Sequence, residues 1–267
     1  MLSVQQIYTH SPLRNYTYVV YSDTSGEAIC IDPFESKSVI TFLRQKKLKL
    51  VSILNTHEHH DHVAGNLELK EETGAIVKAH PGAKEKIPGL DEVIKDNEIA
   101  FENDESKIIA LETPGHTFCH HCYVLQTSKK TVALFSGDTL FNAGVGNCYR
   151  GGEPKVLFET IKNKLNQFPL EMKLYPGHDY WENNIKFAKE VDPKNHYLTE
   201  IENLIRTYHS ETSPFVSEYG QELKINPFFR LREVMESNPE YFQNMPPDVL
   251  KSEENLFIYL RSVRDKW

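Results

Sequence analysis

The chain has little of what exported or membrane proteins need. Among its 267 residues there are only four cysteines, too few to hold a chain of this length together with disulfides. No apolar run approaches the ~18 residues that a membrane helix requires. The N-terminal segment MLSVQQIYTH also lacks the basic and apolar regions of a secretory signal. We therefore expect a cytoplasmic protein without a membrane partner.

An excess of basic charge is also absent. The formal net charge is −8, from 30 Lys and Arg against 38 Asp and Glu. A negative surface repels a phosphate backbone, so we expect no nucleic acid partner and favour a small-molecule substrate. The composition, 39% hydrophobic and 25% charged, is that of a globular protein with one large core or one core and an appendage. A monomer is the default expectation.

The cysteines are Cys30, Cys119, Cys122 and Cys148, and we expect free thiols. Cys119 and Cys122 form a C-x-x-C motif, for which a redox or zinc role is the alternative. A structural zinc site would need a second pair, which the sequence lacks. The following segment HHCYVLQT is typical of a strand rather than of a helix N-terminus.

Strand and helix patterns alternate through the first two thirds of the chain. VQQIYTH, YTYVVYS and AICIDPF predict an antiparallel meander between Val4 and Pro33. Helices are expected at residues 36–47, 64–72 and 155–167, with strands such as LVSILNTH, AIVKAHP, CYVLQT and TVALFSGD between them. This alternation predicts a layered α/β sandwich.

After Tyr180 the pattern is helical to the end. Proline-punctuated segments predict helices at residues 182–190, 196–209, 227–236 and 247–266. We therefore expect two domains, one at residues 1–180 with alternating strands and helices and a helical one at residues 181–267.

The strongest motif is THEHHDH at Thr56–His62, which directly follows an apolar strand pattern. Imidazole and carboxylate groups are ligands for zinc, iron and manganese. His57 and His59 lie two residues apart, so in an extended segment they face the same side. Asp61 and His62 can then turn toward a second ion.

Three more segments end an apolar strand with a glycine turn followed by a potential ligand. They are ALETPGH with His116, ALFSGD with Asp138 and KLYPGH with His178. Glycine permits the sharp turn that directs the next side chain inward. Near His116, His120 is a candidate for a supporting contact to the ligands.

The candidate metal ligands are His57, His59, Asp61, His62, His116, Asp138 and His178. One tetrahedral ion cannot use so many ligands, so two divalent ions are implied, roughly 3.5–4 Å apart. With Asp138 as the bridge, the two sets are His57, His59 and His116, and Asp61, His62 and His178. A bridging water would then have its pKa lowered toward neutrality and serve as a hydroxide nucleophile. Zinc is the first candidate, and the ligands also accept iron or manganese.

The motifs T-H-x-H-x-D-H, T-P-G-H-T, G-D-T-L-F and P-G-H-x-Y between Thr56 and Tyr180 resemble the metallo-β-lactamase superfamily. That resemblance implies a four-layer αββα sandwich with the metals at one edge of its sheets. GDTLFNAGVGNCYRGG, INPFFRLRE and the terminal VRDKW are similar to the glyoxalase II family of hydroxyacylglutathione hydrolases. The closer similarity extends over nearly the whole chain.

This resemblance implies hydrolysis of S-2-hydroxyacylglutathione thioesters, such as S-lactoylglutathione to lactate and glutathione, in the second step of methylglyoxal detoxification. Asp61 and Asp138 would be the catalytic carboxylates. Tyr149 and Tyr180 match tyrosines that hold the glutathione moiety in the family, and Arg264 matches a C-terminal arginine that binds a carboxylate.

Three positions depart from the family pattern. Asn147 stands where many members have a basic residue, and Cys119 replaces a glycine. Trp267 stands where a lysine is expected, and the adjacent Lys266 could take its role.

Three alternatives have the same metal motifs. A glutathione persulfide dioxygenase would use a single iron and oxygen, but the helical region with INPFFR argues against it. A lactonase, β-lactamase or phosphoesterase would hydrolyse lactones, β-lactams or phosphoesters on the same fold. A binding protein that has lost catalysis would not be expected to keep all seven candidate ligands.

Overall fold

The computed structural model describes residues 2–103, 106–128, 130–243 and 245–267. The chain forms two compact units that alternate along the sequence. The first comprises residues 1–113, 119–137 and 175–179, and the second comprises residues 114–118, 138–174 and 180–267. The two units are described in turn.

The first unit contains most of the strands. These are β1 (Ser3–Tyr8), β2 (Tyr16–Tyr21), β3 (Glu27–Ile31), β4 (Lys49–Leu54), β5 (Ile76–Ala79), β6 (Leu90–Val93), β7 (Ile99–Glu102), β8 (Ser106–Glu112), β9 (His121–Thr127) and β10 (Thr131–Gly137). Its helices are α1 (Ser36–Lys46), α2 (His60–Val63), α3 (Asn66–Thr73) and the 3₁₀ helix η1 (Pro81–Ala83). The strand β13 (Lys173–Pro176) leads from the second unit into the first.

Two sheets form the first unit, in the orders β1-β2-β3-β4-β5-β6 and β13-β10-β9-β8-β7. The predicted meander β1-β2-β3 is antiparallel, whereas β3, β4, β5 and β6 pair in parallel. The change follows from the connections, because α1 links β3 to β4 and α2 with α3 links β4 to β5. The carboxyl ends of these parallel strands therefore meet at one edge.

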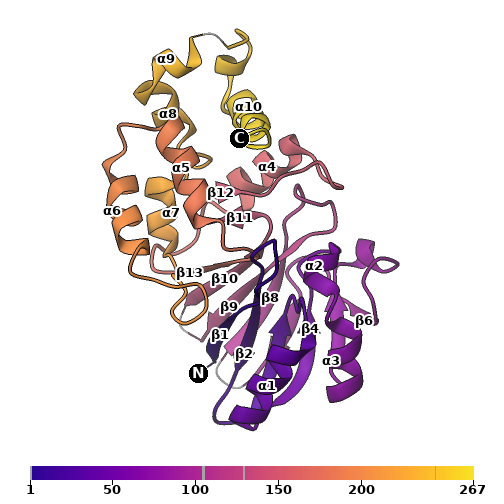
Figure 1. The fold of residues 1–267 in the computed structure, drawn as a ribbon. Coiled ribbons are helices and arrows are strands. Elements are labelled where there is room, and N and C mark those ends of the chain that lie inside the picture. The colour runs from indigo at the N-terminus through magenta and orange to yellow at the C-terminus, as the bar shows by residue number, and fades with distance from the viewer. Residues whose placement is uncertain (1, 104–105, 129, 244) are drawn as a thin grey trace. The chain divides into compact units, whose positions relative to one another are not determined.

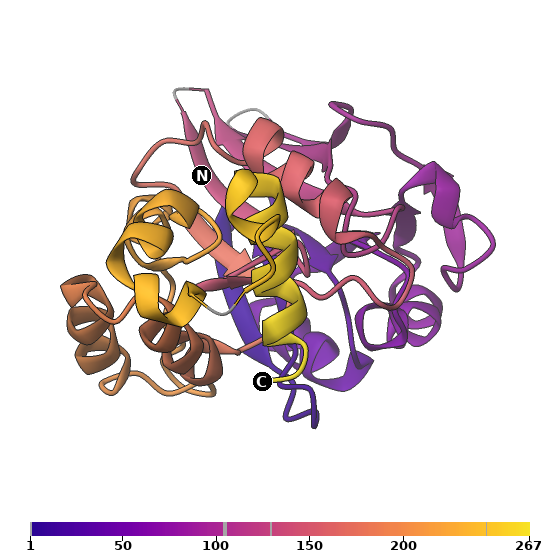
Figure 2. The same cartoon turned by 90° about the horizontal axis from the view of Figure 1, so that it is seen from above.

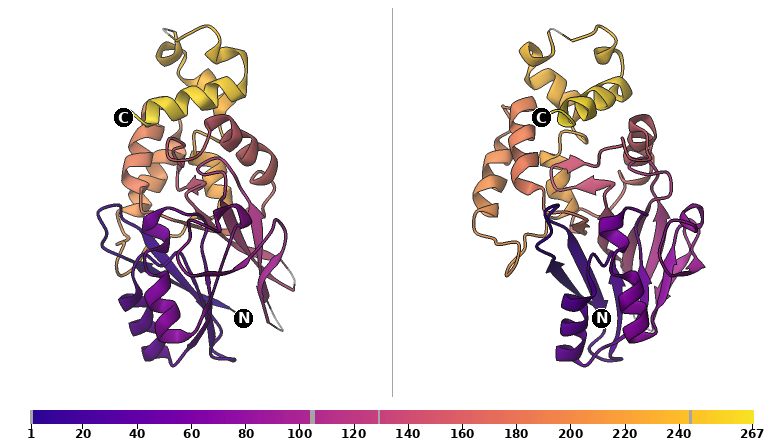
Figure 3. Two further views of the ribbon diagram at one scale, coloured as in Figure 1. Left: turned by 90° about the vertical axis from the view of Figure 1, so that its right-hand side faces the viewer. Right: turned by 45° about the vertical axis from the view of Figure 1, so that its right-hand side comes forward.

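Alternating residues on each strand of the first sheet enter different cores. On β2, Tyr18 and Val20 belong to a core formed with the second sheet, while Val19 and Tyr21 belong to a core on the opposite face. Leu43 of α1 joins this second core. The expected layered α/β arrangement is therefore present, with α1 and α3 on the outer face of the first sheet (Figures 1 and 3).

Sequence patterns missed two strands of this unit, β6 and β7. Each has four residues and is the last strand of its sheet. Edge strands are short and partly exposed, and most residues of LDEV and IAFE are not buried. They therefore lack the apolar pattern that identifies a central strand.

The second unit is mainly helical. Its elements are β11 (Leu140–Phe141), β12 (Gly144–Val145), α4 (Pro154–Lys164), α5 (Trp181–Val191), α6 (His196–Ile205), α7 (Tyr219–Ile225), α8 (Leu231–Ser237), α9 (Pro239–Phe242), η2 (Val249–Lys251) and α10 (Glu253–Arg264). Helices α4 and α10 pack side by side (Figure 2). Phe158 contacts Phe257 between them. No helix of the described residues is long and apolar enough to cross a membrane.

The C-terminal helices differ in detail from expectation. The helix expected to begin at Pro227 begins at Leu231, because the Asn226 side chain accepts a hydrogen bond from the Phe228 backbone N–H and so makes a turn there. The preceding helix α7 was not predicted. Its first turn has a capping box in which Glu218 and Gln221 satisfy each other's backbone N–H groups.

A buried carboxylate organises the β11–β12 hairpin. Glu222 accepts hydrogen bonds from the side chain of Asn142 at 3.1 Å and from the backbone N–H of Ala143 at 2.7 Å. Burial raises the pKa of Glu222 to about 7, although hydrogen bonds from Ala143, Asn142, Ser217 and Asn226 oppose this increase.

We expect a pH-dependent stability from Glu222. Its pKa is higher in the folded than in the unfolded chain, so the folded state binds more protons between about pH 4.5 and 7. The contribution of Glu222 to the free energy of unfolding should fall by on the order of 3 kcal/mol as the pH rises through that window. Urea titrations of the wild type and of Glu222→Gln at about pH 5 and about pH 7.5 measure it. A difference between the two proteins that does not change with pH would contradict this assignment.

Candidate metal centre

The first histidine cluster begins where β4 ends. Asn55 and Thr56 follow the last residue of the strand and are buried, and the hydroxyl of Tyr123 donates a hydrogen bond to the Asn55 carbonyl oxygen at 2.9 Å. His57 is fully buried, and α2 begins at His60. The THEHHDH motif therefore occupies the carboxyl edge of the parallel strands, as the sequence predicted for a strand end.

Asp32, at the end of β3, supports this motif. Its carboxylate accepts hydrogen bonds from the Thr56 backbone N–H at 2.7 Å and from the Thr56 hydroxyl at 2.6 Å. The same carboxylate lies 2.9 Å from Nδ1 of His62. An ionised carboxylate only accepts hydrogen bonds, so Nδ1 of His62 carries the hydrogen and Nε2 keeps its lone pair.

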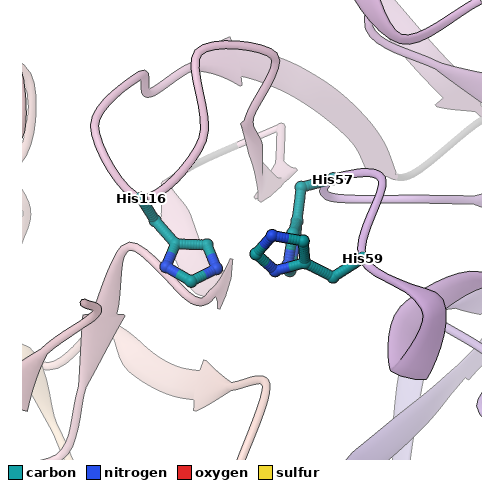
Figure 4. Close-up of side chains that lie close together, drawn as sticks. All are labelled: His57, His59 and His116. Carbon is teal, nitrogen blue, oxygen red and sulfur yellow. The ribbon is translucent and has the colours of Figure 1, made fainter. Parts of the chain in front are cut away.

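Thr56 orients His57 by the same logic. The hydroxyl hydrogen of Thr56 is donated to Asp32, and its oxygen lies 3.0 Å from Nδ1 of His57. That oxygen therefore accepts from Nδ1, which places the hydrogen of His57 on Nδ1 and the lone pair on Nε2. Nε2 of His57 lies 3.0 Å from Nδ1 of His59, and Figure 4 shows both rings.

His178 is oriented by a backbone carbonyl. Its Nδ1 donates to the Leu13 carbonyl oxygen at 2.8 Å, so its Nε2 also keeps a lone pair. This Nε2 lies 3.3 Å from Nε2 of His62, and each nitrogen lies 3.5 Å from Oδ2 of Asp61.

The convergence of these atoms suits a cation. In the neutral imidazoles, two nitrogen lone pairs and one carboxylate oxygen face one another in a largely buried space, which is unfavourable unless a positive charge lies among them. Asp61, His62 and His178 form one group of potential metal ligands, and Asp32, His57 and His62 form another. Because Asp32 uses its oxygens on Thr56 and His62, we take it as support for the ligands rather than as a ligand.

His120 lies beside this cluster without joining it. Its ring stacks on that of His57, with centroids 5.1 Å apart, and its Nδ1 lies 2.9 Å from the Thr113 hydroxyl. Gly137 makes the close packing feasible, because a Cβ there would lie 2.5 Å from the Thr56 hydroxyl oxygen and 2.7 Å from Nε2 of His120.

Two further candidate ligands, His116 and Asp138, belong to the second unit. Nδ1 of His116 donates to the Asn147 carbonyl oxygen at 2.6 Å, and Nε2 lies 3.5 Å from Oδ2 of Asp138. His116 therefore presents Nε2, as His57, His62 and His178 do, and Figure 4 draws its ring. Glycine is required at position 146, because a Cβ there would lie 1.9 Å from the Asp138 carbonyl oxygen.

The substrate-binding candidates all lie in the second unit. Tyr149 is 69% exposed, whereas Tyr180 is partly buried and its ring packs against that of Phe141. Arg264 is partly buried and donates to the Asn184 side chain at 3.2 Å. Lys266 is exposed.

Burial lowers the pKa of the Arg264 guanidinium, and the neighbouring positive charge of Arg261 adds to this effect. Arg261 was not singled out in the sequence. It is buried, donates to the Val145 carbonyl oxygen and forms an ion pair with Asp265. Nothing distinguishes it in sequence from other basic residues of a helix. Asp32, by contrast, follows the apolar strand AICI and resembles the other strand-end carboxylates.

The cysteines behave as expected of free thiols. All four are unbridged, and Cys30, Cys122 and Cys148 are buried. Burial raises the pKa of the Cys119 thiol and that of Cys148, the latter to about 12. A thiol with a raised pKa is a poor nucleophile, so the environment of Cys119 disfavours a redox role for the C-x-x-C motif.

We expect Asp32→Asn to destabilise the metal-free protein. The isosteric amide cannot accept hydrogen bonds on its nitrogen, so Thr56 or His62 would lose an acceptor inside the fold. The expected loss is about 1–3 kcal/mol in the free energy of unfolding, measured by urea titration with a chelator present. Asp23→Asn, at an exposed position, is the control. A loss within about 0.5 kcal/mol of the control value would show that this network does not stabilise the fold.

Comparisons with known proteins agree with this arrangement. Residues 11–186 match the Metallo-beta-lactamase superfamily, and residues 179–267 match the Hydroxyacylglutathione hydrolase C-terminus. Among solved structures, ETHE1 from Myxococcus xanthus has a TM-score of 0.66 at 20% identity and covers 96% of this chain and 99% of its own. The BLEG-1 B3 metallo-beta-lactamase has a TM-score of 0.65 at 22% identity, over 85% of this chain and 99% of its own. These structures share the fold, an α/β sandwich that is followed here by a helical region.

Full-length relatives narrow the family. A hydroxyacylglutathione hydrolase of Polaromonas sp. is 36% identical over 99% of both chains. A second, from Nitrosococcus oceani, is 34% identical over 99% of both chains. The similarity therefore includes the helical C-terminal region as well as the metal-binding motifs. The chain belongs to the hydroxyacylglutathione hydrolase family, within the metallo-β-lactamase superfamily.

Proposed function

We propose that this protein hydrolyses S-2-hydroxyacylglutathione thioesters, such as S-lactoylglutathione to lactate and glutathione, as in the second step of methylglyoxal detoxification. The observation that carries the proposal is the convergence of Nε2 of His62, Nε2 of His178 and Oδ2 of Asp61, which suits a divalent cation. The full-length similarity to two hydroxyacylglutathione hydrolases supports this substrate class.

Two divalent ions are proposed. His57, His59 and His116 (Figure 4) would hold the first, Asp61, His62 and His178 would hold the second, and Asp138 would serve both. The donor types support zinc as the resident metal, and iron or manganese would also suit them. The Nδ1 contacts of His57, His62, His116 and His178 support this assignment, because each leaves an Nε2 lone pair for metal binding.

When bound, such ions polarise a carbonyl group and provide hydroxide at neutral pH. The side chains of the protein then orient the reacting groups. The Asp61 carboxylate can accept a hydrogen bond from the attacking nucleophile while remaining a ligand. The leaving thiol has a pKa of about 8.5, so the thiolate departs without a strong general acid. This agrees with the absence of a separate acid motif from the sequence.

We propose Tyr149, Tyr180, Arg264 and Lys266 as residues that hold the glutathione part of the substrate. Tyr149 is exposed and available to a ligand. Arg264 offers a guanidinium for a carboxylate of the substrate. A helical substrate-binding domain at residues 181–267, following a catalytic domain at residues 1–180, belongs to the same proposal.

The proposal includes a monomer that acts in the cytoplasm on a small molecule and not on nucleic acid. The net charge of −8 supports the exclusion of a polyanionic substrate.

The test is anaerobic hydrolysis of S-lactoylglutathione by protein of known metal content, followed as thiol release. We expect rapid turnover with about two metal ions per chain. Turnover of glutathione persulfide that requires oxygen and a single iron, with no thioester hydrolysis, would favour the dioxygenase alternative. Preference for a lactone over the thioester would favour another hydrolase of the same fold.

We expect His57→Ala and Asp138→Ala each to lower kcat/KM by at least about 100-fold, which is the upper range for residues that only support metal ligands. Each variant should also bind less metal, because each loses a ligand. Metal analysis and steady-state kinetics measure both effects. His209→Ala, at an exposed position, should match the wild type. Full activity and full metal content in either ligand variant would refute the two-ion assignment.

Arg264→Ala should raise KM by about 10-fold and change kcat by less than about 3-fold. A charge-assisted hydrogen bond to the non-reacting part of the substrate contributes equally to the ground state and the transition state. Initial rates over a range of S-lactoylglutathione concentrations separate the two constants. The exposed Arg206→Ala is the control. A fall in kcat at unchanged KM would exclude a binding role for Arg264.

A further inference from the structure

The connection between β1 and β2 has an unusual backbone. His10 and Arg14 both have positive φ values, 55° and 60°, although neither is glycine. Such conformations cost free energy and persist where surrounding contacts hold them. The turn is closed by a hydrogen bond from the Arg14 N–H to the Ser11 carbonyl oxygen at 2.9 Å and by one from the Thr9 N–H to the Asn15 carbonyl oxygen at 3.1 Å.

Asn15, at the end of this turn, contacts a proposed metal ligand directly. Its side chain is buried, and its Nδ2 donates to Oδ2 of Asp61 at 2.8 Å and to the Asp61 carbonyl oxygen at 3.2 Å. These two bonds hold the carboxylate of Asp61 relative to its own backbone. One rotamer of Asp61 is thereby favoured.

Ser11 determines which way the Asn15 amide points. Its hydroxyl oxygen accepts from the Asn15 backbone N–H at 3.1 Å, so its own hydrogen is available to Oδ1 of Asn15 at 2.6 Å. The amide oxygen of Asn15 is therefore on the Ser11 side, and the NH₂ group must face Asp61. Reversing the amide would place its oxygen against the Asp61 carboxylate, which cannot donate a hydrogen bond when ionised.

The same turn also holds His178. The Leu13 carbonyl oxygen accepts from Nδ1 of His178, and the Arg14 carbonyl oxygen accepts from the Asp179 N–H at 2.9 Å. Arg14 in turn donates through Nε to the Asp179 carbonyl oxygen at 2.9 Å and forms an ion pair with its side chain. His57, by contrast, is oriented by Thr56, which lies outside the turn.

We propose that the Ser11–Asn15 turn is a positioning element for one of the two ions, in which Asn15 sets the Asp61 carboxylate and Leu13 sets the His178 ring. The inference rests on the proposed function, because it assumes that Asp61 and His178 are ligands of the same ion. It assigns a role to Asn15 and Ser11, which supply no ligand themselves. Loss of the Asn15 amide should weaken binding of the ion held by Asp61, His62 and His178 and leave the affinity for the other ion unchanged.

Zinc binding by Asn15→Asp tests this. The substitution keeps the shape, removes the donor and places a second carboxylate 2.8 Å from Oδ2 of Asp61. Zinc titrated against a competing chelator should give two binding steps in the wild type. In the variant one binding step should weaken by about 10- to 100-fold, as expected for an outer contact to a ligand, and the other by less than about 3-fold. Two steps within about 2-fold of the wild type would overturn the proposal.

Ser11→Ala is the milder second variant. It keeps the Asn15 amide but removes the Ser11 hydroxyl that orients it. The zinc-binding step that weakens in Asn15→Asp should therefore weaken here by a smaller factor. This variant decides the question if Asn15→Asp does not fold, as judged by circular dichroism. Equal weakening of both zinc ions in a folded Ser11→Ala protein would contradict a role confined to one ion.

Asn195→Asp is the matched control. Asn195 is also a buried asparagine whose Nδ2 donates to an aspartate, Asp192, at 3.0 Å. It therefore reproduces the cost of placing a carboxylate beside a buried aspartate without touching a proposed ligand. Its zinc affinities should equal those of the wild type.

The zinc titration is independent of catalysis. Wild-type protein that binds two zinc ions but does not hydrolyse S-lactoylglutathione would refute the proposed substrate while leaving the role of Asn15 to be decided by the variants. If the wild type hydrolyses the thioester but both zinc-binding steps are unchanged in Asn15→Asp and Ser11→Ala, the positioning role alone is refuted.

Discussion

The metal centre depends on which nitrogen of each histidine carries the hydrogen. Nδ1 of His62 contacts the Asp32 carboxylate, and Nδ1 of His178 contacts the Leu13 carbonyl oxygen. These acceptors fix the tautomers so that both Nε2 lone pairs converge within 3.3 Å. Without a cation this arrangement would be repulsive, so the network that orients the rings also makes the site selective for positive charge. The ring orientations are therefore those expected of a metal-binding site rather than of a chance group of histidines.

The fold supplies these acceptors from strand ends and tight turns. Asp32 directly follows β3, Thr56 comes just after β4, and Leu13 lies in the turn before β2. The parallel order of β3 and β4 brings the first two to the same edge, where the Asp32 side chain reaches Thr56. The Leu13 acceptor is a backbone carbonyl, and the side-chain acceptors of Asp32 and Thr56 are buried and hydrogen-bonded to each other. The ring orientations are therefore set before any metal binds, which reduces the free-energy cost of assembling the site.

Much of the architecture could be predicted because its signals are local. Alternation in YTYVVY separates two cores, and the observed burial of Tyr18 and Val19 in different clusters follows from it. The short edge strands β6 and β7 were not predicted because exposed edge strands need no apolar pattern. Helix α7 was not predicted because its buried face, Tyr219, Glu222 and Ile225, includes a charged residue that interrupts the apolar pattern. Both omissions concern segments whose structure is decided by their neighbours.

The sequence by itself determined the class of protein, because THEHHDH and three glycine turns place ligand-type residues at strand ends, and strand ends gather wherever a sheet forms. Spacing along the chain was enough to nominate His57, His62 and His178. Only the tertiary structure decided which atoms support them. Asn15 and Asp61 are 46 positions apart, and His178 and Leu13 are 165 apart. Such contacts leave no periodic trace in a sequence, since hydrogen-bond partners distant along the chain are chosen by three-dimensional packing and not by local pattern.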